Sequence, residues 1–277
     1  MFTKENTHFQ LWRIFCILAS LYSVAFYYFY QAPLFSVIFW VGQFLLIHFV
    51  HKSIQTGSRW AFLFYPVMMT LNFFVMKISF TPYISWRFDS YLNAIDSNIF
   101  GKNLSQILST YAEPLYSDIL SAIYICSFLI LYFTCFLYLY GASIFQVRRF
   151  HNGLFSLISI LFILNILLPT VGPYLYLKTP LMEGGEITAL NNSLILQYSN
   201  YMDSFPAFPV AITFFLIFSF IRDFKIIGFI LTPFLVLITL ASLYLKFHYF
   251  SDVCLAIILA LICFFYFSYG FKKNKIY

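Results

Sequence analysis

Two long apolar runs flank a short polar segment near the end of the chain: IIGFILTPFLVLITLASLYL (226–245), KFHYFSD (246–252) and VCLAIILALICFFYFSYGF (253–271). Each run approaches the ~20 apolar residues that a helix needs to cross a ~30 Å hydrocarbon core. The rest of the chain is similar, since 62% of its 277 residues are hydrophobic and only 9% are charged. A soluble domain would carry roughly 25% charged residues. The sequence therefore predicts an all-α polytopic membrane protein.

The apolar runs predict about eight transmembrane helices. They cover residues 11–31, 34–50, 60–79, 115–141, 153–170, 205–221, 226–245 and 252–270. The polar stretch between the third and fourth runs has apolar residues at helical spacing, so we expect short helices lying in the membrane interface there. The expected organisation is N-terminal transmembrane helices at 1–79, an external interfacial segment at 80–114 and a transmembrane core at 115–277.

The positions of the basic residues predict the orientation, because cytoplasmic loops carry an excess of Lys and Arg. With both termini in the cytoplasm, eleven of the sixteen basic residues fall inside, including Lys4, Lys272, Lys273 and Lys275. Eight of the ten acidic residues fall on the external side. Of the five histidines, only His248 is external in this topology. Any external chemistry that needs an imidazole therefore has one candidate.

His248 and Asp252 form a candidate catalytic pair at the start of the last span. Their four-residue spacing places both on one face of a helix. The aspartate can accept one imidazole N–H and leave the other ring nitrogen free as a nucleophile or base. Ionisable groups near membrane depth are costly and usually functional. The five cysteines all lie in apolar runs without paired spacing, so the sequence implies no metal site, disulfide or cofactor. The basic residues form no concentrated face, so we expect no nucleic-acid partner.

The segment YLKFHYFSDV (244–253) resembles the last signature of the type 2 phosphatidic acid phosphatase (PAP2) superfamily. It is closest to the branch that contains the inositolphosphorylceramide synthases. FDSYLNAIDSNIFG (88–101), LYSDILSAIYICSF (115–128), LLPTVGPYLYL (167–177) and SFPAFPVA (204–211) follow in the order of that branch. The resemblance covers about residues 85–270 and implies that the last six spans form a PAP2-type helical bundle.

The resemblance also implies roles for individual residues. His248 matches the nucleophile that forms a phosphohistidine, and Asp252 matches the residue that orients it. Lys246 matches a basic position just before the histidine. Lys178 lies near the first motif, where Tyr174 replaces an arginine common in the family. Together with Arg87, these lysines are the predicted phosphate-binding residues.

The middle motif departs from the family, because Ala207 and Pro209 replace its serine and its general-acid histidine. A general acid typically contributes ~10²–10⁴ in rate, and proline has no proton to donate. Other groups in the same loop are candidate acids. Asp203 and Tyr201 are the two that we single out, beside Tyr198, Glu183 and Glu186.

Three functions are compatible with the sequence. The first is a phosphatase or phosphotransferase that acts on a lipid phosphate or phospholipid at the external leaflet, with a bacterial inner membrane and a periplasmic site expected. The second is a degenerate PAP2-like protein that binds lipid or phosphate without turnover. The third is a transporter or structural membrane protein, although no span carries a charge at its middle.

Overall fold

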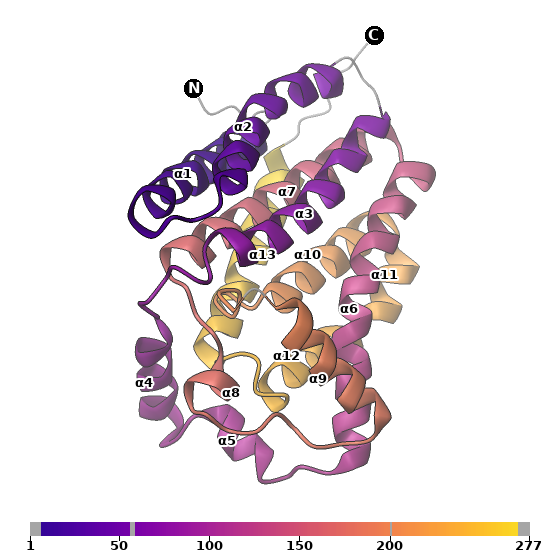
Figure 1. The fold of residues 1–277 in the computed structure, drawn as a ribbon. Helices are drawn as coiled ribbons and strands as arrows, with labels where there is room; N and C mark the ends of the chain where they lie inside the picture. Colours follow the sequence, from indigo (N-terminus) through magenta and orange to yellow (C-terminus); the bar gives the residue numbers. More distant parts are fainter. Residues whose placement is uncertain (1–6, 56–58, 200, 271–277) are drawn as a thin grey trace.

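The computed structural model describes residues 7–55, 59–199 and 201–270 and is built from helices (Figure 1). The membrane-length segments are α1 (Thr7–Tyr30), α2 (Leu34–Gln55), η1 (Arg59–Leu63) with α3 (Phe64–Ser79), α6 (Pro114–Gly141), α7 (Ile144–Leu167), α11 (Lys225–Leu231) with α12 (Pro233–Tyr244), and α13 (Phe250–Gly270). The 16-residue α10 (Phe208–Asp223) is shorter. The shorter helices are α4 (Asp89–Phe100), α5 (Leu104–Ser109), α8 (Pro173–Tyr176) and α9 (Glu186–Tyr198). Lys4, Lys272, Lys273 and Lys275 lie outside the described residues.

The prediction of an all-α polytopic membrane protein is confirmed. Within the described part of the chain, seven helical segments are long and apolar enough to cross a membrane. The sixth expected span, 205–221, corresponds to α10, which has 16 residues and begins later than expected because residues 204–207 form a turn. The expected seventh span is divided at Thr232 into α11 and α12, with Pro233 as the first residue of the second helix. Proline suits that position because its missing N–H would have no intrahelical partner there.

Helix α7 forms the centre of the bundle and packs against α1, α10 and α13. Ser143 and Gln146 close a capping box at its start, which satisfies backbone N–H groups that the helix cannot pair internally. Aromatic rings fill the contacts around it. The Tyr138 and Phe150 rings stack with centroids 3.9 Å apart, and the Trp12 and Phe155 rings stack at 4.1 Å.

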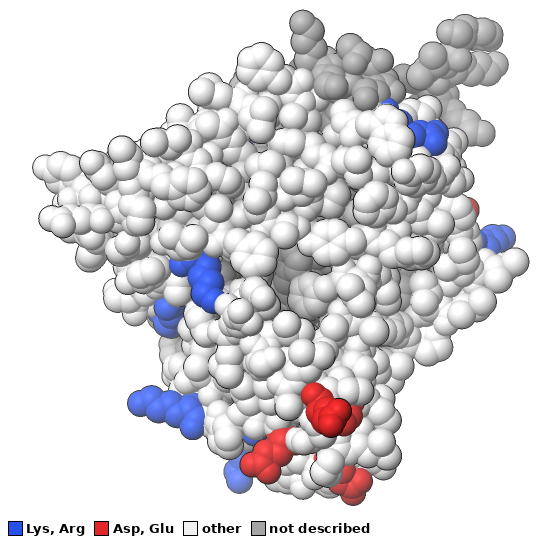
Figure 2. Space-filling model, turned by 45° about the vertical axis from the view of Figure 1, so that its right-hand side comes forward, with Lys and Arg blue, Asp and Glu red and all other residues white. Residues whose placement is uncertain are grey.

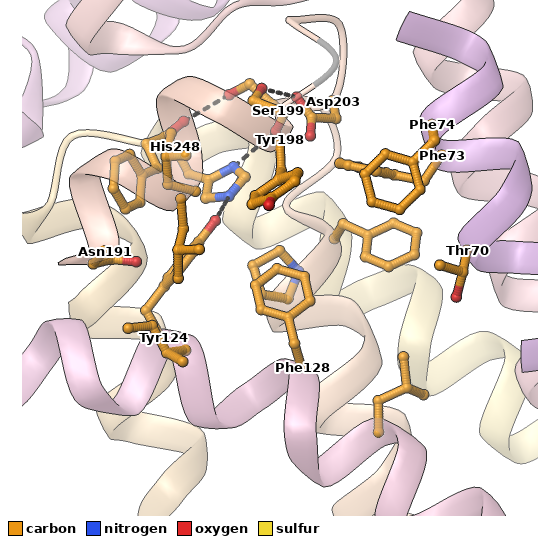
Figure 3. Close-up of a pocket in the computed structure, with 18 of the residues that line it drawn as sticks. Thr70, Phe73, Phe74, Tyr124, Phe128, Asn191, Tyr198, Ser199, Asp203 and His248 are labelled. Atoms are coloured by element: carbon orange, nitrogen blue, oxygen red, sulfur yellow. Dashed lines mark hydrogen bonds between the residues drawn. The ribbon is translucent and has the colours of Figure 1, made fainter.

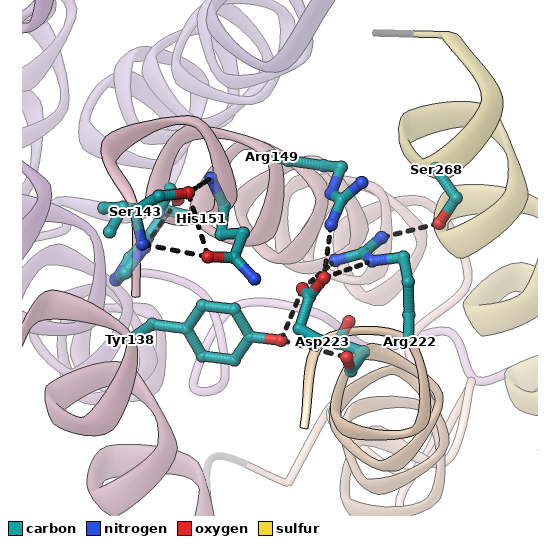
Figure 4. Close-up of polar contacts among 10 residues, drawn as sticks. Tyr138, Ser143, Arg149, His151, Arg222, Asp223 and Ser268 are labelled. Carbon is teal, nitrogen blue, oxygen red and sulfur yellow. Dashed lines mark hydrogen bonds and ion pairs between the residues drawn. The ribbon is translucent and has the colours of Figure 1, made fainter. Parts of the chain in front are cut away.

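A buried polar network ties four helices together at one end of the bundle (Figure 4). The Asp223 carboxylate pairs with Arg149 of α7 and, at 2.7 Å, with Arg222. It also accepts a hydrogen bond of 2.9 Å from the Tyr138 hydroxyl of α6, while Arg222 donates to Ser268 of α13 at 2.6 Å. The carboxylate lies between two guanidinium groups, so its charge is compensated where an isolated buried ion would be costly.

The opposite end gathers the three connections that the sequence predicts to be external (Figure 1). The predicted short helices of 80–114 are present as α4 and α5, and the 171–204 connection contains α8 and α9. These segments contact the loop between α12 and α13, since the Tyr249 hydroxyl donates to Asp89 and Lys246 donates to the Pro180 carbonyl. Their interfacial position, and the division of the chain at residues 79 and 114, stay predictions.

Candidate active site

His248 lies in the loop between α12 and α13, with only 3% of its surface exposed. Its Nδ1 atom is 2.9 Å from the backbone carbonyl of Ser204. A carbonyl oxygen can only accept, so this contact requires the proton to sit on Nδ1. The neutral ring therefore carries its lone pair on Nε2.

Asp252 lies in the first turn of α13 and is fully buried. Its Oδ1 atom is 3.6 Å from Nδ1 of His248, which is too long for a hydrogen bond. Oδ2 accepts from the backbone N–H of Tyr249 at 2.9 Å, and the Ser204 hydroxyl lies 3.4 Å away. Asp252 thus accepts a hydrogen bond from the backbone beside the histidine. The acceptor of the ring N–H is the Ser204 carbonyl, where the sequence predicted Asp252.

The surroundings of His248 set its protonation. Burial lowers the pKa of its imidazole, but the Asp252 carboxylate, the Ser204 carbonyl and the charge of Asp203 raise it, and the net pKa lies above the ordinary value. The Asp252 carboxylate is the largest of the raising influences. The pair therefore favours positive charge on the ring more than water does.

A cavity of about 320 Å³ opens at the His248 ring (Figure 3). We call it the His248 cavity. Its walls come from α3, α6, α9 and α10 together with Ser199, Asp203 and Ser204, and they are mainly aromatic and aliphatic. Its polar groups include His248, Tyr124, Tyr174, Asn191, Ser199 and Asp203. Figure 3 shows Asp203 and Tyr198 beside His248 at one end, with Thr70, Phe73 and Phe74 at the other. A cavity that is polar beside His248 and mainly apolar elsewhere suits a lipid.

The segment that departs from the family forms part of the cavity wall. Phe208 and Pro209 line it at the first turn of α10, without filling the space beside the imidazole. A phenol from another element lies beside the reactive nitrogen: the Tyr124 hydroxyl of α6 is 3.4 Å from Nε2. Tyr124 belongs to the LYSDILSAIYICSF stretch, but no spacing in the sequence relates it to His248, 124 positions further on.

The structure brings together only one of the two singled-out candidate acids and His248. Asp203 lines the cavity and accepts a hydrogen bond of 3.0 Å from the Ser199 hydroxyl. Tyr201 does not line it, and its hydroxyl donates to the Leu196 carbonyl at 2.7 Å.

The predicted phosphate-binding residues lie outside the cavity lining. Lys246 is buried and donates to the Pro180 carbonyl at 3.0 Å, and burial lowers the pKa of its ammonium, with Glu183 opposing. Lys178 is exposed after α8. Arg87 is partly buried near Asp89, and burial lowers its pKa while Asp89 raises it. Among the described residues, no lysine or arginine lines the cavity.

Two aspartates of α4 position the loop of His248, and neither was a candidate from the sequence alone. Asp89 accepts from the backbone N–H groups of Val171 and Gly172 and, at 3.0 Å, from the Tyr249 hydroxyl. Burial raises the pKa of Asp89, and these hydrogen bonds oppose the rise. Asp96 accepts from two backbone N–H groups at the start of α13. Their seven-residue spacing, two helical turns, was the available signal.

Gly172 allows the chain to pass close to the histidine loop. Its φ is +86°, and a Cβ atom there would lie 2.5 Å from the carbonyl oxygen of Phe247. Only glycine adopts this conformation at that distance without strain. In the described residues, no group of three or more His, Cys, Asp or Glu side chains could hold a metal ion.

Comparisons with known proteins bear on this geometry. A family model described as the PAP2 superfamily matches residues 91–266, which is more than half of the chain. No curated protein and no solved structure matched the chain significantly. The match begins after α3 and includes the His248 segment and most of the cavity wall. The chain belongs to the PAP2 superfamily.

Proposed function

We propose that this chain is a lipid phosphatase or phosphotransferase of the inositolphosphorylceramide synthase-like branch, acting through a phosphohistidine at His248. One observation carries the proposal. A buried, oriented imidazole lines a cavity of about 320 Å³ whose walls are mainly aromatic and aliphatic. Membership of the superfamily supports a lipid phosphate as substrate.

The proposed reaction has two steps. Nε2 of His248 forms a bond to phosphorus while the bond from phosphorus to the leaving oxygen breaks, and the leaving oxygen takes a proton. Water, or the hydroxyl group of an acceptor lipid, then attacks phosphorus and breaks the P–N bond. The ring is cationic while phosphorylated, because Nδ1 keeps the proton held by Ser204, and the nearby Asp252 carboxylate stabilises that charge.

Asp203 is the proposed proton donor, in the role that Pro209 leaves open. It lines the same cavity as His248 and is the only carboxyl group among the described lining residues. Tyr124 is proposed to position the phosphoryl group, because its hydroxyl already lies 3.4 Å from Nε2. A hydroxyl at that place can donate to a phosphoryl oxygen when substrate enters.

We place the site at the external leaflet of a bacterial inner membrane, with both termini in the cytoplasm. The distribution of Lys and Arg along the sequence supports this orientation. The gathering of α4, α5, α8 and α9 at the His248 end supports a common side for the three predicted external connections.

The test uses the purified full chain in nanodiscs. Phosphate release is measured from phosphatidic acid, and head-group transfer from phosphatidylinositol to an added lipid alcohol. Acid-labile, base-stable phosphate on the protein reports the intermediate. His248→Asn should abolish turnover and labelling, whereas His51→Asn, an imidazole that does not line the cavity, should retain both. Turnover that survives His248→Asn rejects the mechanism.

A degenerate, lipid-binding protein is the second candidate. The observation that favours it is the cavity lining, which holds Pro209 and, among the described residues, no lysine or arginine to balance a phosphate. This candidate predicts that no substrate is turned over, even after Pro209→His with Ala207→Ser. It also predicts that alkyl phosphates still bind.

A further inference from the structure

A second cavity continues the His248 cavity between α3 and α6. This outer groove has a volume of about 300 Å³ and is lined by apolar side chains, among them Val67, Leu71 and Phe136. Thr70 and Tyr132 line both cavities. The two spaces therefore share one boundary, formed by a side chain from each helix.

Thr70 and Tyr132 are joined across that boundary by a hydrogen bond of 2.6 Å between their hydroxyl groups. The Thr70 hydroxyl also donates a hydrogen bond of 2.9 Å to the Pro66 carbonyl, which fixes the rotamer of Thr70. Val67, Thr70 and Leu71 of α3 line the groove, and so do Tyr132 and Phe136 of α6, so the two helices face each other across it. We call this hydroxyl pair the Thr70–Tyr132 bar; it crosses an opening whose other outer-groove side chains are apolar.

The outer groove opens toward the surface of two membrane-spanning helices. Val67, Leu71 and Phe136 are 53%, 43% and 49% exposed, and on such helices this surface meets hydrocarbon. In Figure 2 one face of the molecule is hollowed, and uncharged residues surround most of the hollow. A lipid chain that begins at His248 therefore has a path along α6 that ends in the bilayer.

We propose that the Thr70–Tyr132 bar sets the length of the hydrocarbon chain that binds with its phosphate at His248. The inference rests on the proposed function, because that function places the phosphate. Tyr124 and Tyr132 are eight residues apart on α6, or about 12 Å at 1.5 Å per residue. Half of a ~30 Å hydrocarbon core is about 15 Å. The His248 cavity, at about 12 Å along α6, is therefore shorter than a lipid chain that spans half of the core. The outer groove adds about 6 Å between Tyr132 and Phe136, which are one helical turn apart.

The test compares binding of decyl, tetradecyl and octadecyl phosphate, each with a terminal photoreactive diazirine, to the full chain in nanodiscs. The wild type should bind the decyl compound best and crosslink it inside the His248 cavity. A pocket that cannot fit even one more methylene discriminates by about tenfold or more, so the octadecyl compound should bind at least that much more weakly. Tyr132→Ala should remove this difference and move the octadecyl crosslinks to Val67, Leu71 or Phe136.

Two further variants complete the test: one changes the bar and the other is a control. Thr70→Val has nearly the same shape and removes the hydrogen bonds of the Thr70 hydroxyl to Tyr132 and to the Pro66 carbonyl, so it should shift the chain-length preference part of the way. Phe133→Ala is the matched control, because Phe133 follows Tyr132, is 67% exposed and lines neither cavity. It should behave as the wild type. An unchanged ranking of chain lengths in Tyr132→Ala and Thr70→Val overturns the proposal, as does the absence of crosslinks in both cavities.

The readout separates this inference from the proposed function. Binding and crosslinking need no turnover, so His248→Asn should keep the chain-length preference even though it abolishes activity. If the chain-length preference does not depend on Thr70 and Tyr132, the result of the phosphohistidine assay is unaffected. If the protein is inactive, Tyr132→Ala can still change the chain-length preference.

Discussion

Replacing Asp252 with asparagine should shift the titration of His248 to lower pH. The carboxylate lies 3.6 Å from Nδ1 of His248 and raises the pKa of the ring, whereas burial, which lowers it, is unchanged in the variant. Two unit charges at that separation interact by about 4–5 kcal/mol at an effective dielectric constant of about 20. This corresponds to an upper bound of roughly 3 pKa units at about 1.4 kcal/mol each. Charge delocalised over both groups reduces the effect, so we expect a fall of about 1–3 units.

The sign of the effect follows from the reacting form. Nε2 attacks only when it is unprotonated, so activity is lost as the pH falls through the raised pKa of His248. The acid limb of kcat/KM in the wild type should therefore lie above pH 6.5, the ordinary value for histidine. In Asp252→Asn the limb should move down by about 1–3 pH units, although the plateau rate falls because the cationic intermediate loses its counter-charge.

Two measurements check this prediction. The nitrogen NMR signals of labelled histidine give the His248 midpoint without turnover, with His248→Asn identifying the signal, and the pH profile of kcat/KM gives the same midpoint kinetically. Asp96→Asn is the matched control, because Asp96 of α4 is also a buried carboxylate near the start of α13 but accepts from the backbone N–H groups of Phe250 and Ser251. A His248 midpoint that stays constant or rises in Asp252→Asn refutes the reasoning.

Three further predictions concern the site and the loops that hold it. Asp203→Asn should lower turnover of alkyl phosphates by about 10²–10⁴ but have little effect on aryl phosphates, whose leaving groups need no proton; equal losses on both would exclude Asp203 as the acid. Asp89→Ala should cost roughly 1–3 kcal/mol for each buried donor left without an acceptor, and Tyr249→Phe, which removes one such hydrogen bond, should lower the unfolding temperature less. Gly172→Ala should destabilise the protein in the same thermal assay, whereas Gly141→Ala, which meets no atom within 4 Å, should not; similar midpoints for these two would contradict the close approach at Gly172.

Much of the fold was predictable, because its signal is local. Runs of about 20 apolar residues specify membrane helices one at a time, and the apolar spacing in 80–114 predicted the short helices there. The predicted boundaries fail where tertiary contacts decide them. Helix α10 begins only at Phe208, because the preceding residues turn to present Ser204 to His248 and Asp252.

The candidate site was only partly predictable, for a related reason. The spacing of His248 and Asp252 is local, and the structure places both side chains together. The groups that complete the site come from distant segments: Tyr124 from α6, and Asp203 from the loop before α10. No periodicity relates these positions. The sequence also grouped Lys246, Lys178 and Arg87 by charge and side of the membrane, and neither property determines which way a side chain points.

The Asp252 carboxylate is placed to stabilise positive charge on the His248 ring. Its Oδ1 atom has no hydrogen-bond partner among the described residues, although it is buried. A buried carboxylate oxygen without a partner destabilises the fold, and native proteins rarely keep one. Its nearest opposite charge would be the His248 ring, 3.6 Å away, once that ring becomes cationic. A phosphorylated imidazole that keeps its Nδ1 proton is such a cation, so the interaction is weak before the reaction and strong as the P–N bond forms. An interaction that strengthens toward the transition state accelerates the reaction, so this geometry suits the proposed phosphohistidine.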